Sequence, residues 1–310
     1  MEIIKLEPVF KHTIWGGSKL RTAFGYSVEG DDVGECWGIS AHPNGDCIIA
    51  DGEYKGMTLS QLFESHRELF GNISGDRFPL LTKIIDARTD LSIQVHPDDA
   101  YAAEHENGSF GKTECWYILD AEPDTTIVIG HHAASGKEVR DMILGRRWSE
   151  FIREIPVKKG DFFQIAPGTV HAIKGGTLIL ETQQNSDITY RVYDYDRLSN
   201  GKPRPLHLMQ SIDVIRAPYV DEKPTVRNDI TVNTNMRQLV TCPFYTVWKF
   251  DVDGMEKLTM DCRFMLVSVI EGDGDVDGEP IKKGDHFIIP SGYPALHFSG
   301  NLQMIVSAPV

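Results

Sequence analysis

A short unit that occurs twice in the chain constrains its fold more than any other feature. Residues 157–168 recur as residues 281–292, at an offset of 124 positions. Each copy begins with one apolar residue and Lys-Lys-Gly-Asp, continues as an apolar run, and ends in a turn containing Pro and Gly. Lys-Gly-Asp favours a tight turn and the apolar run favours a buried strand. The repeat therefore predicts two copies of one small β-domain.

Short apolar and β-branched runs separated by turn residues fill much of the remaining chain, which is typical of a β-sandwich or jelly roll. The repeated turn–strand–turn unit also occurs in cupins, which are small jelly rolls. We therefore expect a mainly β protein made of two cupin-type jelly-roll barrels. Residues 1–220 would form the first domain and residues 221–310 the second, with a loop-forming connection at residues 217–227.

Three segments carry helix signals. Thr58 and Ser135 each open a capping box, and the residues that follow them have apolar side chains at helical spacing. Pro97 and the acidic residues after it are typical of a helix start. The pattern predicts helices over about 58–70, 98–107 and 135–154, the last interrupted at Gly145. A small helical insertion, residues 130–155, would thus belong to the first domain.

Composition and charge exclude several classes of protein. The 310 residues suffice for two domains, and 31 basic against 45 acidic residues give a net charge of −14. Such a chain repels phosphate backbones, so we expect no nucleic-acid partner. No apolar run approaches the roughly 18 residues of a membrane span, and no signal peptide is recognisable. Five widely spaced cysteines without a CxxC pair indicate free thiols in a cytoplasmic protein. The sequence does not determine the oligomeric state.

Four side chains from separate segments could form one metal site. Gln94 and His96 lie two residues apart at the end of a strand-like run, so they share one face. Glu114 opens the next expected strand, and His171 follows the first Pro-Gly turn. Imidazole nitrogen and carboxylate oxygen suit zinc, and an amide adds a weaker oxygen ligand. The second copy of the repeat has Ala295 at the position of His171, so we expect that domain to bind no metal.

A structural role is the alternative for each of these histidines taken alone, because a core histidine with satisfied hydrogen bonds is the commoner case. Their occurrence beside the repeated unit favours metal binding. The pair His131-His132 follows an expected strand and precedes a helix cap, so we interpret it as a solvated loop. His105 is interpreted as an exposed helix end.

The segment from Asp187 to Arg197 is dense in Asp, Tyr and Arg. If it is extended, Asp187, Thr189, Arg191, Tyr193 and Tyr195 share one face, which indicates a lined pocket. A polar edge strand is the alternative. Lys83 stands inside an apolar run, where a charge is costly unless it is paired, so we expect a buried anionic partner or a side chain that reaches solvent. Lys112 would share a face with Glu114.

The sequence resembles the short bacterial form of the type I phosphomannose isomerases, zinc-dependent cupins that act on mannose 6-phosphate. The runs Leu91–Pro97 and Asp187–Asp194 are the most specific parts of this resemblance. It also rests on the Trp-Gly-Gly run at Trp15 and on the runs at residues 35–43, 111–114 and 167–172.

The resemblance implies a role for each matching residue. Gln94, His96, Glu114 and His171 would be zinc ligands. Arg191 would be the catalytic arginine, and Lys112 and Asp187 would lie near the reacting carbons. Lys83 would contact phosphate, and Trp15 would belong to the substrate site. Longer relatives carry a larger helical insertion between the Glu and second His ligands, and here Thr113 replaces a common proline.

The expected activity is therefore the zinc-dependent interconversion of mannose 6-phosphate and fructose 6-phosphate through a cis-enediol. A non-catalytic sugar-phosphate-binding protein with the same two barrels is the alternative, because a fold does not fix a function. An iron-dependent cupin oxygenase is a third reading, since two histidines and one carboxylate can also hold iron. A small sugar phosphate is the only partner that the resemblance implies.

Overall fold

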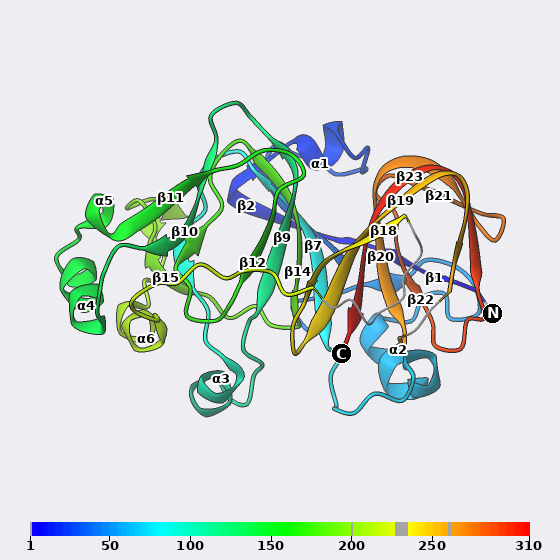
Figure 1. Cartoon of the computed structure of the whole chain (residues 1–310), viewed down its shortest axis with the longest axis horizontal. Coiled ribbons are helices and arrows are strands. Elements are labelled where there is room, and N and C mark those ends of the chain that lie inside the picture. The colour runs from blue at the N-terminus through cyan, green and yellow to red at the C-terminus, as the bar shows by residue number, and fades with distance from the viewer. Residues whose placement is uncertain (1, 200, 227–234, 260–261) are drawn as a thin grey trace.

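The computed structural model describes residues 2–199, 201–226, 235–259 and 262–310. Two barrels of β-strands lie side by side, the N-terminal one on the left of Figure 1 and the C-terminal one on the right. Helices are few and lie at the edges of the strand layers. The predicted fold class, a mainly β protein of two cupin-type barrels, is confirmed.

Two sheets form the N-terminal barrel. The six-stranded sheet has the order β12 (Phe162–Ile165), β9 (Glu114–Ala121), β14 (Thr177–Gln184), β7 (Leu80–Ala87), β2 (Val9–Gly17) and β3 (Val33–Ile39). The five-stranded sheet has the order β11 (Ile152–Pro156), β10 (Thr126–His131), β13 (His171–Ala172), β8 (Ile93–Val95) and β15 (Tyr190–Tyr193). All of these pairs are antiparallel, as expected for a jelly roll.

One eight-stranded sheet forms the C-terminal barrel. Its order is β18 (Met236–Thr241), β19 (Tyr245–Leu258), β23 (Leu296–Pro309), β20 (Met265–Val276), β22 (His286–Ile289), β1 (Ile4–Glu7) and β6 (Ile48–Ile49), with β21 (Glu279–Lys282) paired to β20. The first strand of the chain thus pairs with a strand about 280 residues later. The domain boundary near residue 220 stays a prediction. The expected connection at 217–227 has no helix or strand through residue 226, and its last residue lies outside the described ones.

The two copies of the repeated unit form the same structure. Lys158 N donates to Asp161 Oδ2 at 3.0 Å, and Lys282 N donates to Asp285 Oδ2 at 2.8 Å. The glycine between each pair has a φ near +90°, which a residue without a Cβ adopts at little cost. Each turn leads into a strand, and these strands have equivalent partners: β12 pairs with β9, and β22 pairs with β20. The prediction that both copies of the repeat form the same turn and strand is therefore confirmed.

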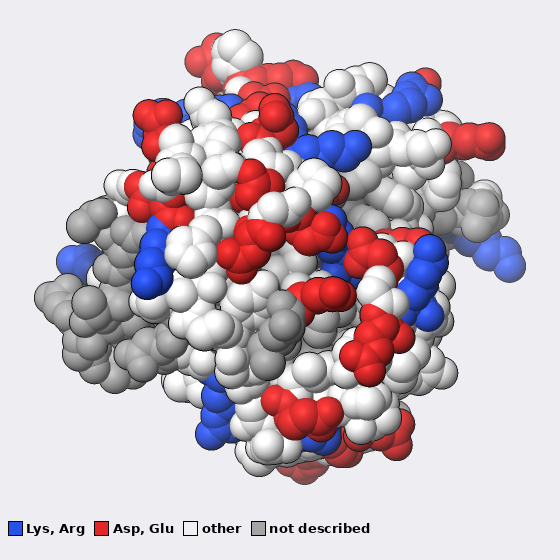
Figure 2. Space-filling model, turned by 90° about the vertical axis from the view of Figure 1, so that its right-hand side faces the viewer, with Lys and Arg blue, Asp and Glu red and all other residues white. Residues whose placement is uncertain are grey.

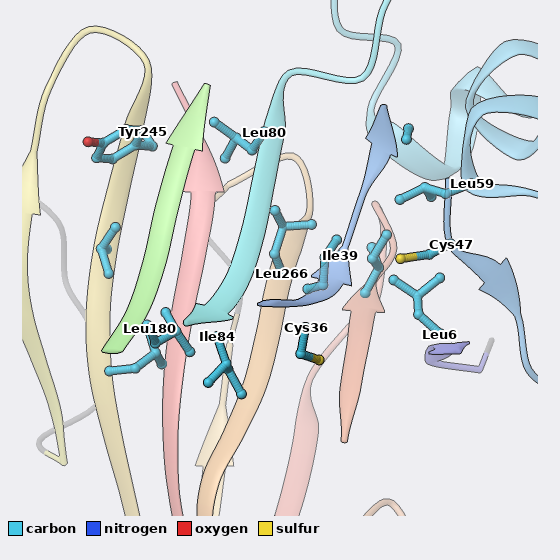
Figure 3. Packing of buried hydrophobic residues seen from close by; sticks show 14 of the residues in the cluster. Leu6, Cys36, Ile39, Cys47, Leu59, Leu80, Ile84, Leu180, Tyr245 and Leu266 are labelled. Atoms are coloured by element: carbon cyan, nitrogen blue, oxygen red, sulfur yellow. The ribbon is translucent and has the colours of Figure 1, made fainter. Parts of the chain in front are cut away.

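Strands β7 and β14 are buried on both faces because a hydrophobic core lies on each side of their sheet. Residues such as Leu80, Ile84 and Leu180 pack against the C-terminal barrel, where they meet Tyr245 and Leu266 (Figure 3). The alternate residues of the same strands face the interior of the N-terminal barrel. Polar side chains on this second face consequently lie deep inside the protein.

The helices agree in part with the sequence prediction. The capping box at Thr58 starts α2 (Leu59–Ser65), and η1 (Arg67–Phe70) completes the first predicted segment. Asp98 caps α3 (Asp99–His105). The third segment is interrupted at Gly145 as predicted: it divides into α4 (Gly136–Leu144) and α5 (Trp148–Phe151), separated by the left-handed residue Arg146. Only its last residues, 152–154, are wrong, because they belong to strand β11.

Two further helices were not predicted, α1 (Lys19–Thr22) and α6 (Leu208–Val214). Nor were two short strand pairs, β4 (Ala41–His42) with β5 (Gly45–Asp46) and β16 (Leu198–Ser199) with β17 (Lys202–Pro203). Helices α4 to α6 cover the outer face of the five-stranded sheet (Figure 1). None of the helices in the described ranges has the length and apolar character needed to span a membrane.

Acidic side chains are spread over the face that the C-terminal barrel turns outward (Figure 2). This distribution agrees with the net charge of −14. A cluster of Lys and Arg side chains is therefore an exception to the overall acidic charge of this protein.

Candidate active site

Three side chains that are distant in sequence meet inside the N-terminal barrel. Glu114 begins β9, His171 begins β13 and His96 follows β8, so both sheets contribute. The Nε2 atoms of His96 and His171 lie 3.1 Å apart, and they lie 3.4 and 3.3 Å from the carboxylate oxygens of Glu114. All three side chains are completely or almost completely buried. Their donor atoms are close enough together to hold one metal ion.

The orientation of these groups fits a cation. His96 Nδ1 donates to Ile188 O at 2.7 Å, and His171 Nδ1 donates to Thr169 O at 2.9 Å. Each neutral ring therefore presents its Nε2 lone pair to the cluster. Glu114 Oε1 is buried and has no hydrogen-bond partner among the described residues. Ligand atoms about 2.0–2.2 Å from a tetrahedral zinc ion lie roughly 3.3 Å from one another, which matches the observed separations.

Gln94 adds a fourth polar group beside the cluster. It lies in β8 directly opposite His171 in β13, and its amide nitrogen is 3.3 Å from His171 Nε2. Rotation of the amide by 180° would present its oxygen to the same point. The pairing of two short strands thus explains how residues 77 positions apart come together.

Lys112 joins the metal cluster to a second carboxylate. Its Nζ atom contacts Glu114 Oε2 and lies 3.1 Å from His96 Nε2. It also lies 3.7 Å from Glu181 Oε1. The prediction that Lys112 and Glu114 share a face is confirmed.

Lys83 has the buried anionic partner that the sequence indicated. Its Nζ atom lies 3.1 Å from Glu181 Oε1 and 3.8 Å from Glu35 Oε2. Trp116 Nε1 donates to the other oxygen of Glu181 at 2.9 Å and fixes that carboxylate. The positive charge of Lys83 is consequently balanced by protein groups on both sides.

Burial and neighbouring charges set the protonation states of the cluster. Burial lowers the pKa of His96 to about 3, aided by the Lys112 ammonium, and burial also lowers the pKa of His171. Burial alone would raise the pKa of Glu114, but Lys112 opposes it and holds that pKa well below its ordinary value. Near pH 7 the cluster therefore contains two neutral imidazoles and one carboxylate, the forms that bind a divalent metal.

A cavity of about 320 Å³ adjoins the cluster. Five of the predicted site residues line it: Trp15, Lys83, Gln94, Lys112 and Arg191. Arg191 lies in β15 opposite Gln94 in β8, and its buried Nε has no hydrogen-bond partner among the described residues. A volume of this size suits one small polar ligand.

Asp187 does not line this cavity. It precedes β15 in a loop, where Asn44 Nδ2 donates to its Oδ2 at 2.5 Å and His42 Nε2 lies 3.5 Å from its Oδ1. It borders a separate cavity of about 340 Å³. The structure therefore brings together eight of the nine predicted residues and leaves Asp187 at the separate cavity, beside His42.

Comparison with known proteins supports one family. Residues 3–141 match the phosphomannose isomerase type I catalytic domain, and residues 235–309 match the mannose-6-phosphate isomerase cupin domain. The mannose-6-phosphate isomerase ManA of Bacillus subtilis is 49% identical over 99% of this chain and 98% of its own length. The mannose-6-phosphate isomerase of Streptococcus mutans is 46% identical over 97% of this chain and 98% of its own length.

A crystal structure described as the mannose 6-phosphate isomerase from Bacillus subtilis superposes with a TM-score of 0.94, at 47% identity and 99% coverage of both chains. The chain belongs to the type I phosphomannose isomerase family. The resemblance seen in the sequence is thus confirmed, as is the class of enzyme that it implied, a mannose-6-phosphate isomerase.

Two predictions about this phosphomannose isomerase family member are wrong. The segment after Asp187 is not one extended strand, because a register shift lies between Arg191 and Tyr193. Arg191 therefore faces the cavity while Tyr193 stacks on Trp148 at 4.7 Å. His131 is not solvated. It ends β10, is 4% exposed, and its Nε2 donates to Arg216 O at 2.9 Å.

Several polar residues of the site were not predicted. Glu181 could have been predicted, because it is an acidic residue directly after the apolar residues of β14. A charged residue in an apolar run is the same pattern that indicated Lys83. Glu35 also lines the cavity. It belongs to the run at residues 35–43, which was noted only as part of the resemblance to the family. Ser199 and Arg204 also line the cavity, and no pattern in the sequence pointed to them.

Proposed function

We propose that this chain interconverts mannose 6-phosphate and fructose 6-phosphate through a cis-enediol, with one bound Zn²⁺. The convergence of two imidazoles and a carboxylate beside a cavity lined by Lys112 and Arg191 carries the proposal. Similarity to mannose-6-phosphate isomerases over nearly the full length supports the choice of substrate.

His96, Glu114 and His171 would hold the metal, with Gln94 as the fourth ligand. Two nitrogen donors and a carboxylate favour zinc among the available divalent ions, and the carbonyls of Ile188 and Thr169 orient the two rings. When bound, zinc supplies a Lewis acid beside the sugar oxygens.

The reaction moves one proton from C2 to C1 and a second from the C2 hydroxyl to the C1 oxygen. Removing the C2 proton gives the enediolate, and returning it to C1 with protonation of the C1 oxygen gives the ketose. Lys112 is the candidate for the proton transfers between carbons, because it lines the cavity beside the cluster. Arg191 would stabilise the oxyanion, since its guanidinium has no carboxylate partner at hydrogen-bond distance among the described residues.

The remaining role assignments stay predictions. An acid–base role for Asp187 would require its loop to turn the carboxylate from His42 toward the first cavity. Trp15 is buried in the cavity wall and would pack against the sugar. A phosphate contact for Lys83 would compete with the carboxylates of Glu181 and Glu35.

We also propose that the second domain binds no metal. In the pairing of β22 with β20, Met265 is opposite Ile289, at the position where Glu114 is opposite Ile165 in the first barrel. The buried thiols of Cys36, Cys47 and Cys115 agree with a reducing cytoplasm.

The test is a coupled assay that follows fructose 6-phosphate formation from mannose 6-phosphate, with zinc measured in the same samples. We expect turnover that is lost on treatment with a chelator and regained on addition of Zn²⁺. Binding of mannose 6-phosphate without turnover by the zinc-loaded protein would favour the non-catalytic alternative. Oxygen consumption by an iron-loaded protein would favour the oxygenase.

A further inference from the structure

A second cavity, of about 340 Å³, lies beside residues 185–188 and shares no lining residue with the first. Its walls come from β4, α2, the loop before β7, the residues after α3 and the segment after β14. Ile188 belongs to this wall, and its carbonyl accepts the hydrogen bond from His96 Nδ1 at 2.7 Å. The second cavity therefore adjoins the candidate metal cluster from outside the substrate cavity.

A buried amide in this wall lacks one of its partners. Asn185 lines the cavity and is 8% exposed. Its Nδ2 donates to Phe78 O at 2.9 Å and its backbone N donates to Pro79 O at 2.9 Å, so the orientation of the amide is fixed. Its Oδ1 is buried and accepts no hydrogen bond from the described residues. Because buried oxygens of this kind are normally paired, a donor from a ligand or a water is expected in the cavity.

The charged side chains around this cavity are mainly acidic. Glu64, Asp76 and Asp187 line it, against the single guanidinium of Arg77. His42 lines it as well, and burial lowers the pKa of His42, so this ring is neutral near pH 7. The wall consequently repels a phosphate ester. Phosphorylated sugars are directed instead to the first cavity, which lysine and arginine side chains line.

The rest of the wall combines apolar surface with hydrogen-bond donors. Phe63, Phe110 and Ile188 supply the apolar part. Arg77 lies over the Phe110 ring at 4.0 Å, and its Nη2 donates to Gly108 O at 2.9 Å. The guanidinium is thus held in place and has further N–H groups for a ligand. A ligand that fits this wall needs donors and acceptors around an apolar framework, and no negative charge.

We propose that the second cavity binds a neutral monosaccharide, a hexose without a phosphate group. Its hydroxyls donate to Asn185 Oδ1 and to the Asp187 carboxylate and accept from Arg77, while its C–H groups contact Phe110. The cavity volume suits one small polar ligand. An organic cation would also pair with the carboxylates, but it would be repelled by Arg77 and would leave the Arg77 donors without an acceptor. Binding at this site does not depend on the proposed isomerase activity.

The test is a titration of the full-length protein with D-mannose, followed by saturation-transfer NMR of the sugar. A hexose in one such cavity should bind with a Kd of about 1 mM. Ser109→Trp and Glu64→Trp place an indole in the cavity from opposite elements, the segment after α3 and helix α2, and each should weaken binding at least about tenfold. Ser109→Ala is the matched control and should leave the Kd within about twofold, and thermal midpoints show that each variant is folded.

The substrate cavity is tested in parallel with Arg191→Ala, which should still bind D-mannose. Binding that is lost in Arg191→Ala and kept in folded Ser109→Trp and Glu64→Trp would place the sugar in the substrate cavity and overturn the proposal. So would absence of saturation transfer from the wild-type protein at about ten times the expected Kd. Ethanolamine binding more tightly than D-mannose, and lost in Ser109→Trp, would assign the cavity to a cation instead. A protein that binds D-mannose as described but does not isomerise mannose 6-phosphate would refute the proposed function alone.

Discussion

Replacing Arg191 by alanine is the sharpest test of the proposed chemistry. The side chain lines the cavity from β15, opposite the candidate ligand Gln94, and its buried Nε has no hydrogen-bond partner in the described part of the chain. It therefore does little to hold the fold together. Its guanidinium is available to a substrate oxygen, so the substitution should affect turnover far more than folding.

The expected magnitude follows from the role of an oriented donor. Removing one preorganised group that stabilises an oxyanion costs about 2.7–4 kcal/mol, or 10²–10³-fold in kcat. Folding stability should change by about 1 kcal/mol or less, because burial and the neighbouring Arg204 disfavour the charge at Arg191 and lower its pKa. Zinc content should not change, since the ligand atoms contact one another, Lys112 and backbone carbonyls.

The measurements are kcat in the coupled isomerase assay, zinc per chain by elemental analysis, and the thermal midpoint. Arg191→Lys is the control, because it keeps a positive charge and loses the planar donor, and it should fall between wild type and Arg191→Ala. A kcat within about threefold of wild type in zinc-loaded Arg191→Ala would refute the role. Loss of zinc together with activity would instead assign Arg191 to positioning Gln94.

Two further predictions concern buried charges. Glu181→Gln should lower the free energy of unfolding by about 3 kcal/mol in denaturant titration, because Lys83 loses its nearer partner at 3.1 Å. Glu35 lies 3.8 Å from Lys83 and is nearer to solvent, so Glu35→Gln should lower the same free energy by about 1 kcal/mol. Equal losses in the two variants would contradict this ranking. Burial lowers the pKa of His286 to about 4, so the unfolded chain binds the extra proton first and stability should fall by roughly 3 kcal/mol as the pH drops from about 6.5 to 4. His286→Gln should reduce that pH dependence, and an unchanged slope would show that other groups cause it.

The sequence predicted those features that depend on local chemistry. The N-cap residues Thr58 and Ser135 do start helices, because a side-chain oxygen there accepts a backbone hydrogen bond whatever surrounds it. The repeated turn also formed as predicted, since Lys-Gly-Asp closes its own hydrogen bond. The helix over 135–154 was predicted a few residues too long, because Ile152 and Glu154 pair with β10 as part of strand β11.

Features that depend on pairing between distant segments could not be predicted. Strand β1 joins the C-terminal sheet through two paired positions, Ile4 with Ile288 and Lys5 with Phe287, and no local pattern identifies that partner. The shift after Arg191 is likewise a property of how β15 pairs with β8. Arg204 lies in a short hairpin region whose composition is that of a loop, so only the structure brings it to Asp194 and the cavity.

The two copies of the repeated unit show why architecture was easier to predict than chemistry. The unit itself forms a turn and a strand, β12 or β22, and its inward positions are similar in both barrels. The polar groups lie on the partner strand, where Glu114 and Trp116 face the interior of the first barrel and Met265 and Val267 take the corresponding places in the second. A buried carboxylate is tolerated only beside counter-charges, and Lys112 supplies one in the first barrel. Met265 packs among apolar residues, so the second barrel can be stable without any cation. The difference between the two candidate sites therefore lies in β9 and β20, the partner strands, which are not part of the repeated unit.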